Sequence, residues 1–242
     1  MSYFPKILAL FLVLVIGILS CKDDPISPTP TNNPITPSQN SPKDLTSIAY
    51  NPAPVAIEKL ENFPNMDIPA DNPLTAEGIE LGKHLFFDPI LSANQQMACA
   101  NCHLPSSAFT DNLPVSTGID EIAGIRSSMA LFNVGYYTKG LFWDGSVVSL
   151  EEQALLPVED PIELHHNWED VIKDLQQHTT YPTLFRKAFG IDNTSEINKE
   201  IAAKAIAQFE RSIVSGQSKY DRVVRGEEFF EDEEFNLSLI HI

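Results

Sequence analysis

Cysteine and basic side chains are scarce in this chain, and each shortage argues against a class of function. Only three cysteines occur among the 242 residues. A structural zinc site takes four ligands and favours paired cysteines, so the cysteine count argues against such a site. Lys and Arg together number 16, against 33 Asp and Glu, which gives a net charge of −17. This balance argues against a nucleic-acid partner, because phosphates would repel an acidic surface.

Internal repeats and sustained alternation of apolar and polar residues are also missing from the sequence. Alternation of period two marks half-buried β-strands, so we expect a helical fold. Capping residues and four-residue apolar spacing predict helices from Thr75 to about Phe87, from Ser149 through a capping box with Glu152, after Asn167, between Pro182 and Gly190, and, as the longest, from about Ser195 to Ser215. Residues 104–148 are rich in Gly, Asn and Ser and predict long loops.

The N-terminus carries the pattern of an export signal. Lys6 precedes an uncharged apolar run over residues 7–19, as in a signal peptide, and the run is short for a membrane-spanning helix. Ile18–Cys21 resembles a bacterial lipobox, whose cysteine is lipidated and becomes the mature N-terminus. We therefore predict a lipoprotein signal peptide at 1–20 and a lipid on Cys21, with an uncleaved anchor helix as the alternative. Either one tethers the protein to a membrane in the cell envelope, on the periplasmic side or at the surface.

The segment after the lipobox is dense in Pro, Thr, Ser and Asn. Such a composition cannot bury a core and favours an extended chain. We expect a tether over residues 21–54. Packed sequence is then expected from Val55 to residue 226, which is long enough for one domain with its own core.

The two remaining cysteines belong to the pentapeptide Cys99-Ala100-Asn101-Cys102-His103. Cys-x-x-Cys-His is the attachment site of a c-type haem, in which both thiols form thioethers with the porphyrin. Cysteines three apart face the same way on one turn of helix, and the histidine that follows can bind the iron as proximal ligand. A thioredoxin-like redox pair would lie beside a βαβ pattern, which this sequence does not show. We predict covalent haem c on Cys99 and Cys102, with His103 on the iron.

Further motifs stand around this pentapeptide in a fixed order. They are LGKHLFFDPILS at 81–92, AFTD at 108–111, STG at 116–118, FWDGS at 142–146, LEEQA at 150–154, PIEL at 161–164 and AIAQFER at 205–211. Together they resemble, over residues 74–226, the N-terminal half of bacterial di-haem cytochrome c peroxidases, including relatives that act in methylamine utilisation. The resemblance implies an all-α, cytochrome c-like haem domain with long haem-wrapping loops.

The resemblance also implies a reaction and its partners. Members of the family reduce hydrogen peroxide to water with electrons from a small cytochrome c or copper protein. Their N-terminal haem reacts with peroxide, and a second haem in the C-terminal half receives the electrons. The acidic surface would suit a basic redox partner, although a plain solvated surface explains it equally well. Two alternatives stay open: a single-haem electron-transfer cytochrome c, and a di-haem oxidase that modifies a partner protein. The oligomeric state is open as well, a dimer included.

The family pattern assigns roles to individual residues. Glu163 matches the acid–base group beside the iron, Gln153 lies next to it, and Trp143 falls between the two haems. Arg126 matches a residue that contacts the cofactor. The residues alone support plainer roles, namely a surface carboxylate for Glu163, a polar helix residue for Gln153 and core packing for Trp143.

The sequence departs from the family pattern at three places. Ile119 occupies the position of a histidine that closes the resting iron in other members, and Ile cannot bind iron. Ser127 replaces an asparagine of an interdomain calcium site, which puts calcium in question. Residues 227–242 are expected to begin a C-terminal region that a truncated gene model cuts short. The stretch from Leu237 onward is unlike the family and resembles translated adapter sequence.

Overall fold

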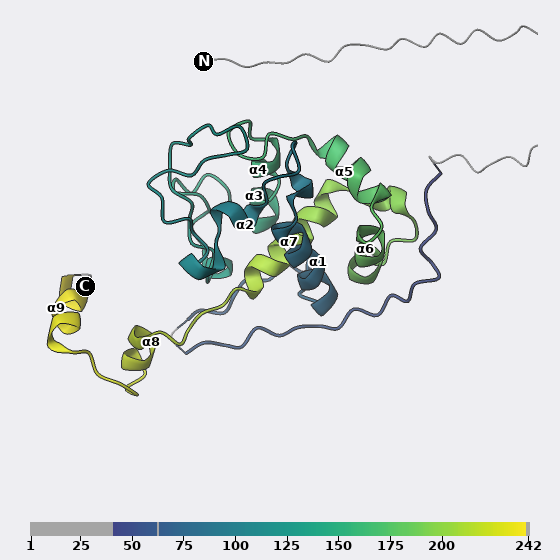
Figure 1. The fold of residues 1–242 in the computed structure, drawn as a ribbon. Coiled ribbons are helices and arrows are strands. Elements are labelled where there is room, and N and C mark those ends of the chain that lie inside the picture. Colours follow the sequence, from purple (N-terminus) through teal and green to yellow (C-terminus); the bar gives the residue numbers. More distant parts are fainter. Residues whose placement is uncertain (1–40, 62, 241–242) are drawn as a thin grey trace, which may run out of the picture. The chain divides into compact units, whose positions relative to one another are not determined.

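The computed structural model describes residues 41–61 and 63–240, and these residues form helices joined by long loops (Figure 1). No strand longer than an isolated β-bridge occurs among them, so the predicted all-α class is confirmed. The α-helices are α1 (Ala76–Phe87), α2 (Cys99–Cys102), α3 (Leu150–Gln153), α4 (Leu156–Glu159), α5 (Trp168–Gln177), α6 (Tyr181–Phe189), α7 (Lys199–Ser212), α8 (Lys219–Val224) and α9 (Asp232–Ile240). The 3₁₀ turns are η1 (Pro89–Leu91), η2 (Pro105–Ser107), η3 (Val134–Tyr136) and η4 (Thr194–Glu196).

Helix α1 begins and packs as its sequence predicts. The Thr75 side chain accepts a hydrogen bond from the Gly78 backbone N–H and so caps the helix. Its most extensive contact is with α7, which crosses it in Figure 1. Gly82 permits this close crossing, since a Cβ built there would lie 1.9 Å from the Ala205 carbonyl oxygen.

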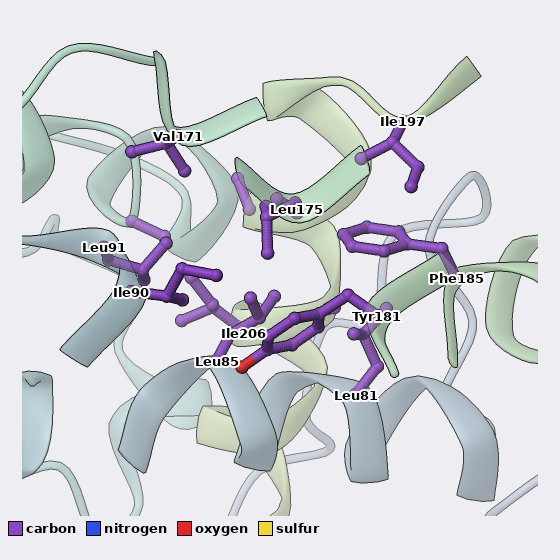
Figure 2. Close-up of a cluster of buried hydrophobic side chains, with 14 of the residues drawn as sticks. Leu81, Leu85, Ile90, Leu91, Val171, Leu175, Tyr181, Phe185, Ile197 and Ile206 are labelled. Atoms are coloured by element: carbon purple, nitrogen blue, oxygen red, sulfur yellow. The ribbon is translucent and has the colours of Figure 1, made fainter. Parts of the chain in front are cut away.

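Helices α5 and α6 close the other side of the main core (Figure 2). Asn167 caps α5 and Gly190 ends α6 in the left-handed region, both as predicted. Tyr181 is fully enclosed, and its hydroxyl donates to Asp88 Oδ2 at 2.8 Å. The core thus joins α1, α5, α6 and α7 into one support for the shorter α2 and the loops.

The longest helix is shorter than its apolar spacing predicts. Residues Thr194–Glu196 form the separate turn η4, and α7 starts only at Lys199. The Asn198 side chain accepts from the Ile201 backbone N–H, and this cap fixes the start. The helix ends at Ser212 instead of Ser215. The apolar residues spaced four apart therefore extend beyond both ends of α7.

The packed chain also begins earlier than Val55. Leu45 is 0% exposed and lies in the main core, and its backbone N–H donates to the Asp192 carbonyl at 2.8 Å. Arg186 Nε donates to the Ile48 carbonyl at 2.9 Å. The predicted tether is therefore wrong for residues 43–48, which are bound along α6 and the α6–α7 connection. Cys21 and the signal peptide lie outside the described residues.

Residues 104–148 form long loops, as predicted, with η2 and η3 as their only helical turns. Isolated bridges pin these loops locally, between Leu104 and Thr110, Thr117 and Ala123, and Leu141 and Val147. In the described residues, no helix combines the length and the apolar character needed to cross a membrane.

Candidate haem-binding site

The Cys-x-x-Cys-His motif forms the single turn α2 and the residue that ends it. Asn101 Oδ1 accepts from the Ala98 backbone N–H at 2.8 Å, and the His103 N–H donates to the Cys99 carbonyl at 3.0 Å. Both cysteines are free thiols. The turn therefore presents two thiols and the following imidazole close together, as the motif predicts.

The imidazole of His103 is held in one tautomer. Its Nδ1 lies 2.9 Å from the Phe109 carbonyl oxygen, which can only accept, so Nδ1 donates and Nε2 is the nitrogen suited to iron. Burial lowers the pKa of His103, and the carbonyls of Phe109 and Met129 act in the opposite direction. The Phe86 ring lies 6.3 Å from the imidazole, centroid to centroid. A neutral, oriented imidazole is the form that binds a metal.

The two thiols are held in their protonated form. Burial raises the pKa of Cys99 to about 12, and the negative charge of Glu210 acts in the same direction. The pKa of Cys102 is also raised, mainly by burial and then by Asp111. A thiol adds across a vinyl group together with its own hydrogen. Two free thiols beside a neutral imidazole thus fit haem c as a donor set.

Glu163 precedes Leu164, whose carbonyl accepts from the Ala93 backbone N–H at 3.0 Å, six residues before the haem motif. Its charge adds to the raised pKa of both thiols, after Glu210 at Cys99 and after Asp111 at Cys102, so its carboxyl is within electrostatic reach of both. Glu163 is exposed, as the plainer role of a surface carboxylate predicts. Enough protein still surrounds the carboxyl for desolvation to raise the pKa of Glu163, with Asp160 adding to the shift. A carboxyl of this kind can hold and release a proton closer to neutral pH than an ordinary glutamate.

The loop that carries Ile119 is joined to the Glu163 loop. The Ile119 backbone N–H donates to the Glu163 carbonyl at 3.0 Å. A Cβ built on Gly118 would lie 1.6 Å from the Ile162 carbonyl oxygen, so only glycine allows this approach. Next to this contact, His165 Nδ1 and Asp120 Oδ2 lie 2.6 Å apart. The position where the family places a histidine ligand is thereby fixed beside Glu163.

Gln153 is the last residue of α3 and is half-buried. Arg211 holds this short helix against α7, since its guanidinium donates to both Glu151 carboxylate oxygens at 2.5 and 2.8 Å. The Asn72 amide donates to the same carboxylate at 2.6 Å. This bidentate, largely buried pair fixes the backbone that carries Gln153.

Trp143 is 60% exposed, so the alternative role in core packing is wrong. Its indole N–H donates to the Ser127 carbonyl at 2.8 Å, and the Arg126 guanidinium donates to Asp144 Oδ2 at 2.8 Å. The 126–128 and 142–146 segments are therefore bound to each other. Arg126 has this carboxylate as its partner, and its contact with a cofactor stays a prediction.

Comparison with known proteins identifies the family. The family model described as "Di-haem cytochrome c peroxidase" matches residues 76–229. The chain belongs to the di-haem cytochrome c peroxidase family. The match spans the haem motif, the Glu163 loop and α7, so the resemblance inferred from the sequence motifs is confirmed.

Relatives within the family carry two kinds of name. The chain is 35% identical over 171 residues to the methylamine utilization protein MauG of Methylophilus methylotrophus, an alignment that covers 71% of this chain and 50% of MauG. It is 31% identical over 185 residues to the cytochrome c551 peroxidase of Pseudomonas aeruginosa, with 76% and 50% covered. A crystal structure of a MauG-like protein associated with microbial copper homeostasis superposes with a TM-score of 0.68 at 30% identity, covering 74% of this chain and 53% of the other. The chain thus spans about half the length of these relatives.

The structure also brings together residues that the sequence analysis did not single out. Glu210 lies in the FER stretch of α7 and is buried. The sequence could have drawn attention to Glu210, because it is a charged residue within an otherwise apolar helix face. The family resemblance assigned it no role. Within the described residues, no group of three or more His, Cys, Asp or Glu side chains is arranged to hold a metal ion. Calcium, which Ser127 already put in question, stays in question.

Proposed function

We propose that this chain is the haem c domain that reduces hydrogen peroxide to water, with electrons from a small cytochrome c or copper protein. The observation that carries the proposal is the placement of Glu163, a carboxyl with a raised pKa, within electrostatic reach of the thiols that would hold the haem. The same proposal includes a lipid on Cys21 and a place in the cell envelope.

The residues divide the work of cleaving the O–O bond. Cys99 and Cys102 would hold the haem, and His103 Nε2 would bind its iron. When bound, the haem would supply the iron that reacts with peroxide and would relay electrons. Glu163 would take a proton from one oxygen of the peroxide and return it to the other, which leaves as water. Two electrons and two protons in total convert one peroxide into two waters. The Gln153 amide would orient the peroxide beside Glu163.

The test uses the chain expressed with a haem-attachment system. Its mass after denaturation should include one haem, and haem that extracts into acidified acetone would contradict the attachment. Glu163→Gln should leave ligand binding to the iron intact and slow peroxide consumption, with a chemical electron donor, by roughly a hundredfold or more, the usual scale of lost acid–base help. Glu159→Gln, an exposed carboxylate at the end of α4, is the matched control and should retain the wild-type rate. Wild-type turnover in Glu163→Gln would remove Glu163 from the mechanism.

A second candidate is an oxidase that uses peroxide to modify a partner protein. It is favoured by two relatives named MauG, at 35% and 38% identity. The two activities differ in their product. A peroxidase consumes many equivalents of peroxide with an electron donor alone, whereas the oxidase leaves an oxidised side chain on a partner, detectable by mass spectrometry. A six-coordinate, low-spin iron without any peroxide reaction would instead favour the single-haem electron carrier.

A further inference from the structure

Glu210 is a carboxyl in the interior of the domain, and one of its oxygens has no hydrogen-bond partner. It is 4% exposed, and its Oε2 is buried without a hydrogen bond. An isolated buried carboxylate is strongly unfavourable, so such a group either binds a proton or sits beside a positive charge. The obvious positive neighbour is Arg211, the next residue in α7.

Arg211 is already neutralised by another carboxylate. Its guanidinium forms two hydrogen bonds with Glu151 of α3, at 2.5 and 2.8 Å. Among the described residues, Arg211 is the one cation that acts on the pKa of Glu210. The buried face of α1 is formed by Gly78, Leu81, Gly82, Leu85 and Phe86, and its Glu80–His84 pair is on the exposed side. The titratable residue of η3, Tyr136, packs its ring on Phe63 at 5.1 Å.

The remaining titratable neighbour is the Cys99 thiol of α2. Cys99 packs against the cluster formed by Phe86, Leu131 and Phe209, and Phe209 is the residue before Glu210. The charge of Glu210 also raises the pKa of Cys99, second only to burial. Burial in turn raises the pKa of Glu210 to about 8, with Arg211 opposing and Glu151 adding to the shift. At neutral pH the carboxyl of Glu210 therefore carries a proton.

Cys99 is the residue to which haem would be attached, so the next step rests on the proposed function. An oxidised haem carries one more positive charge than a reduced one. In a poorly solvated interior this charge acts strongly on a nearby carboxyl. Oxidised haem favours the carboxylate of Glu210, and reduced haem favours the protonated acid.

We propose that Glu210 is a proton site coupled to the oxidation state of the haem. One electron passes from the redox-protein donor to the haem iron, and one proton passes from solvent to a carboxylate oxygen of Glu210, where an O–H bond forms. Oxidation of the iron breaks this bond and returns the proton to solvent. Glu210 thus compensates the charge of the haem and does not touch the substrate. Glu163, by contrast, would contact the peroxide.

The experiment measures the haem midpoint potential of the full chain from pH 6 to pH 9. The wild-type potential should fall with pH, toward a limit of one proton per electron, which is a tenfold change in the reduction equilibrium per pH unit, or about 59 mV. Glu210→Gln should remove at least half of this slope. Glu200→Gln, an exposed glutamate of the same helix, should keep the wild-type slope. Reduced-minus-oxidised infrared spectra should show a carboxylic acid C=O band that is absent in Glu210→Gln.

Several outcomes would overturn the inference. A wild-type midpoint potential that is independent of pH would overturn it, and so would a wild-type difference spectrum without a C=O band. A pH slope that stays unchanged in Glu210→Gln would also overturn it. Covalent haem and peroxide reduction with a flat potential would overturn only the role of Glu210. A chain that takes up no haem on Cys99 and Cys102 would overturn the proposed function together with it.

Discussion

Ile119 is the residue at which the sequence motifs predict the clearest chemical departure from the family. Its side chain cannot bind iron, and its backbone N–H is bonded to the Glu163 carbonyl at 3.0 Å. The loop is thus held beside the acid–base residue with an apolar side chain at the place where other members are expected to carry a ligand. Nearby His165 is engaged by Asp120 at 2.6 Å. Both observations favour an iron that keeps its sixth position open.

This arrangement predicts direct ligand binding. The oxidised, haem-loaded chain should be mainly high-spin and should bind cyanide without prior reduction. Ile119→His should convert it toward a low-spin spectrum and slow cyanide binding, because an imidazole at this position would occupy the iron. Ile125→His adds the same side chain to the same loop at a residue that is 86% exposed, and it should leave the spectrum unchanged. A low-spin, bis-histidine spectrum in the wild type would show that another residue, such as His165 or His166, binds the iron.

At the scale of secondary-structure elements, capping residues predicted where helices begin and end. Features that depend on long-range contacts could not be predicted in this way. Thr75, Asn167 and Gly190 act within one turn of chain, so their caps could be identified from sequence. The burial of Leu45 depends on Asp192, almost 150 residues away, and composition alone suggested a tether. The site divides in the same way. The haem motif is local, whereas the environment of Glu210 exists only once α2, α3 and α7 pack together.

The crossing of α1 and α7 supports α2 and α3, and it depends on Gly82. A Cβ at this position would lie 1.9 Å from the Ala205 carbonyl oxygen and 2.5 Å from its carbon, both of them backbone atoms. Gly82→Ala should therefore destabilise the fold by about 1–3 kcal/mol or more, as overpacking does. Chemical denaturation of the two proteins measures this loss.

Lys83→Ala is the control for that measurement, since Lys83 is the next residue of α1 and points to solvent. Its stability should stay within about 0.5 kcal/mol of the wild type. Equal stability of Gly82→Ala and Lys83→Ala would mean that α1 and α7 can separate at no cost, contrary to the packing described here.

At the scale of the whole molecule, export and cofactor chemistry agree with each other. Haem c is normally attached outside the cytoplasm, and the signal peptide predicted at residues 1–20 would direct the chain there. The net charge of −17 would add attraction for a basic redox partner, screened by salt over about 8–10 Å. The haem domain would thus act at the membrane surface, where a lipid on Cys21 keeps it close to its electron supply.

The anchor can be tested without reference to catalysis. Cys21→Ala removes the thiol that would carry the lipid, so the variant should be found in the soluble fraction or keep its signal peptide, whereas the wild type should fractionate with membranes. Ser20→Ala, a change to the preceding residue that leaves the thiol in place, serves as the control and should behave as the wild type. Mass spectrometry of the N-terminal peptide reads out the lipid directly. A Cys21→Ala protein that matures and fractionates like the parent would exclude lipidation at Cys21 and leave the apolar run itself as the anchor.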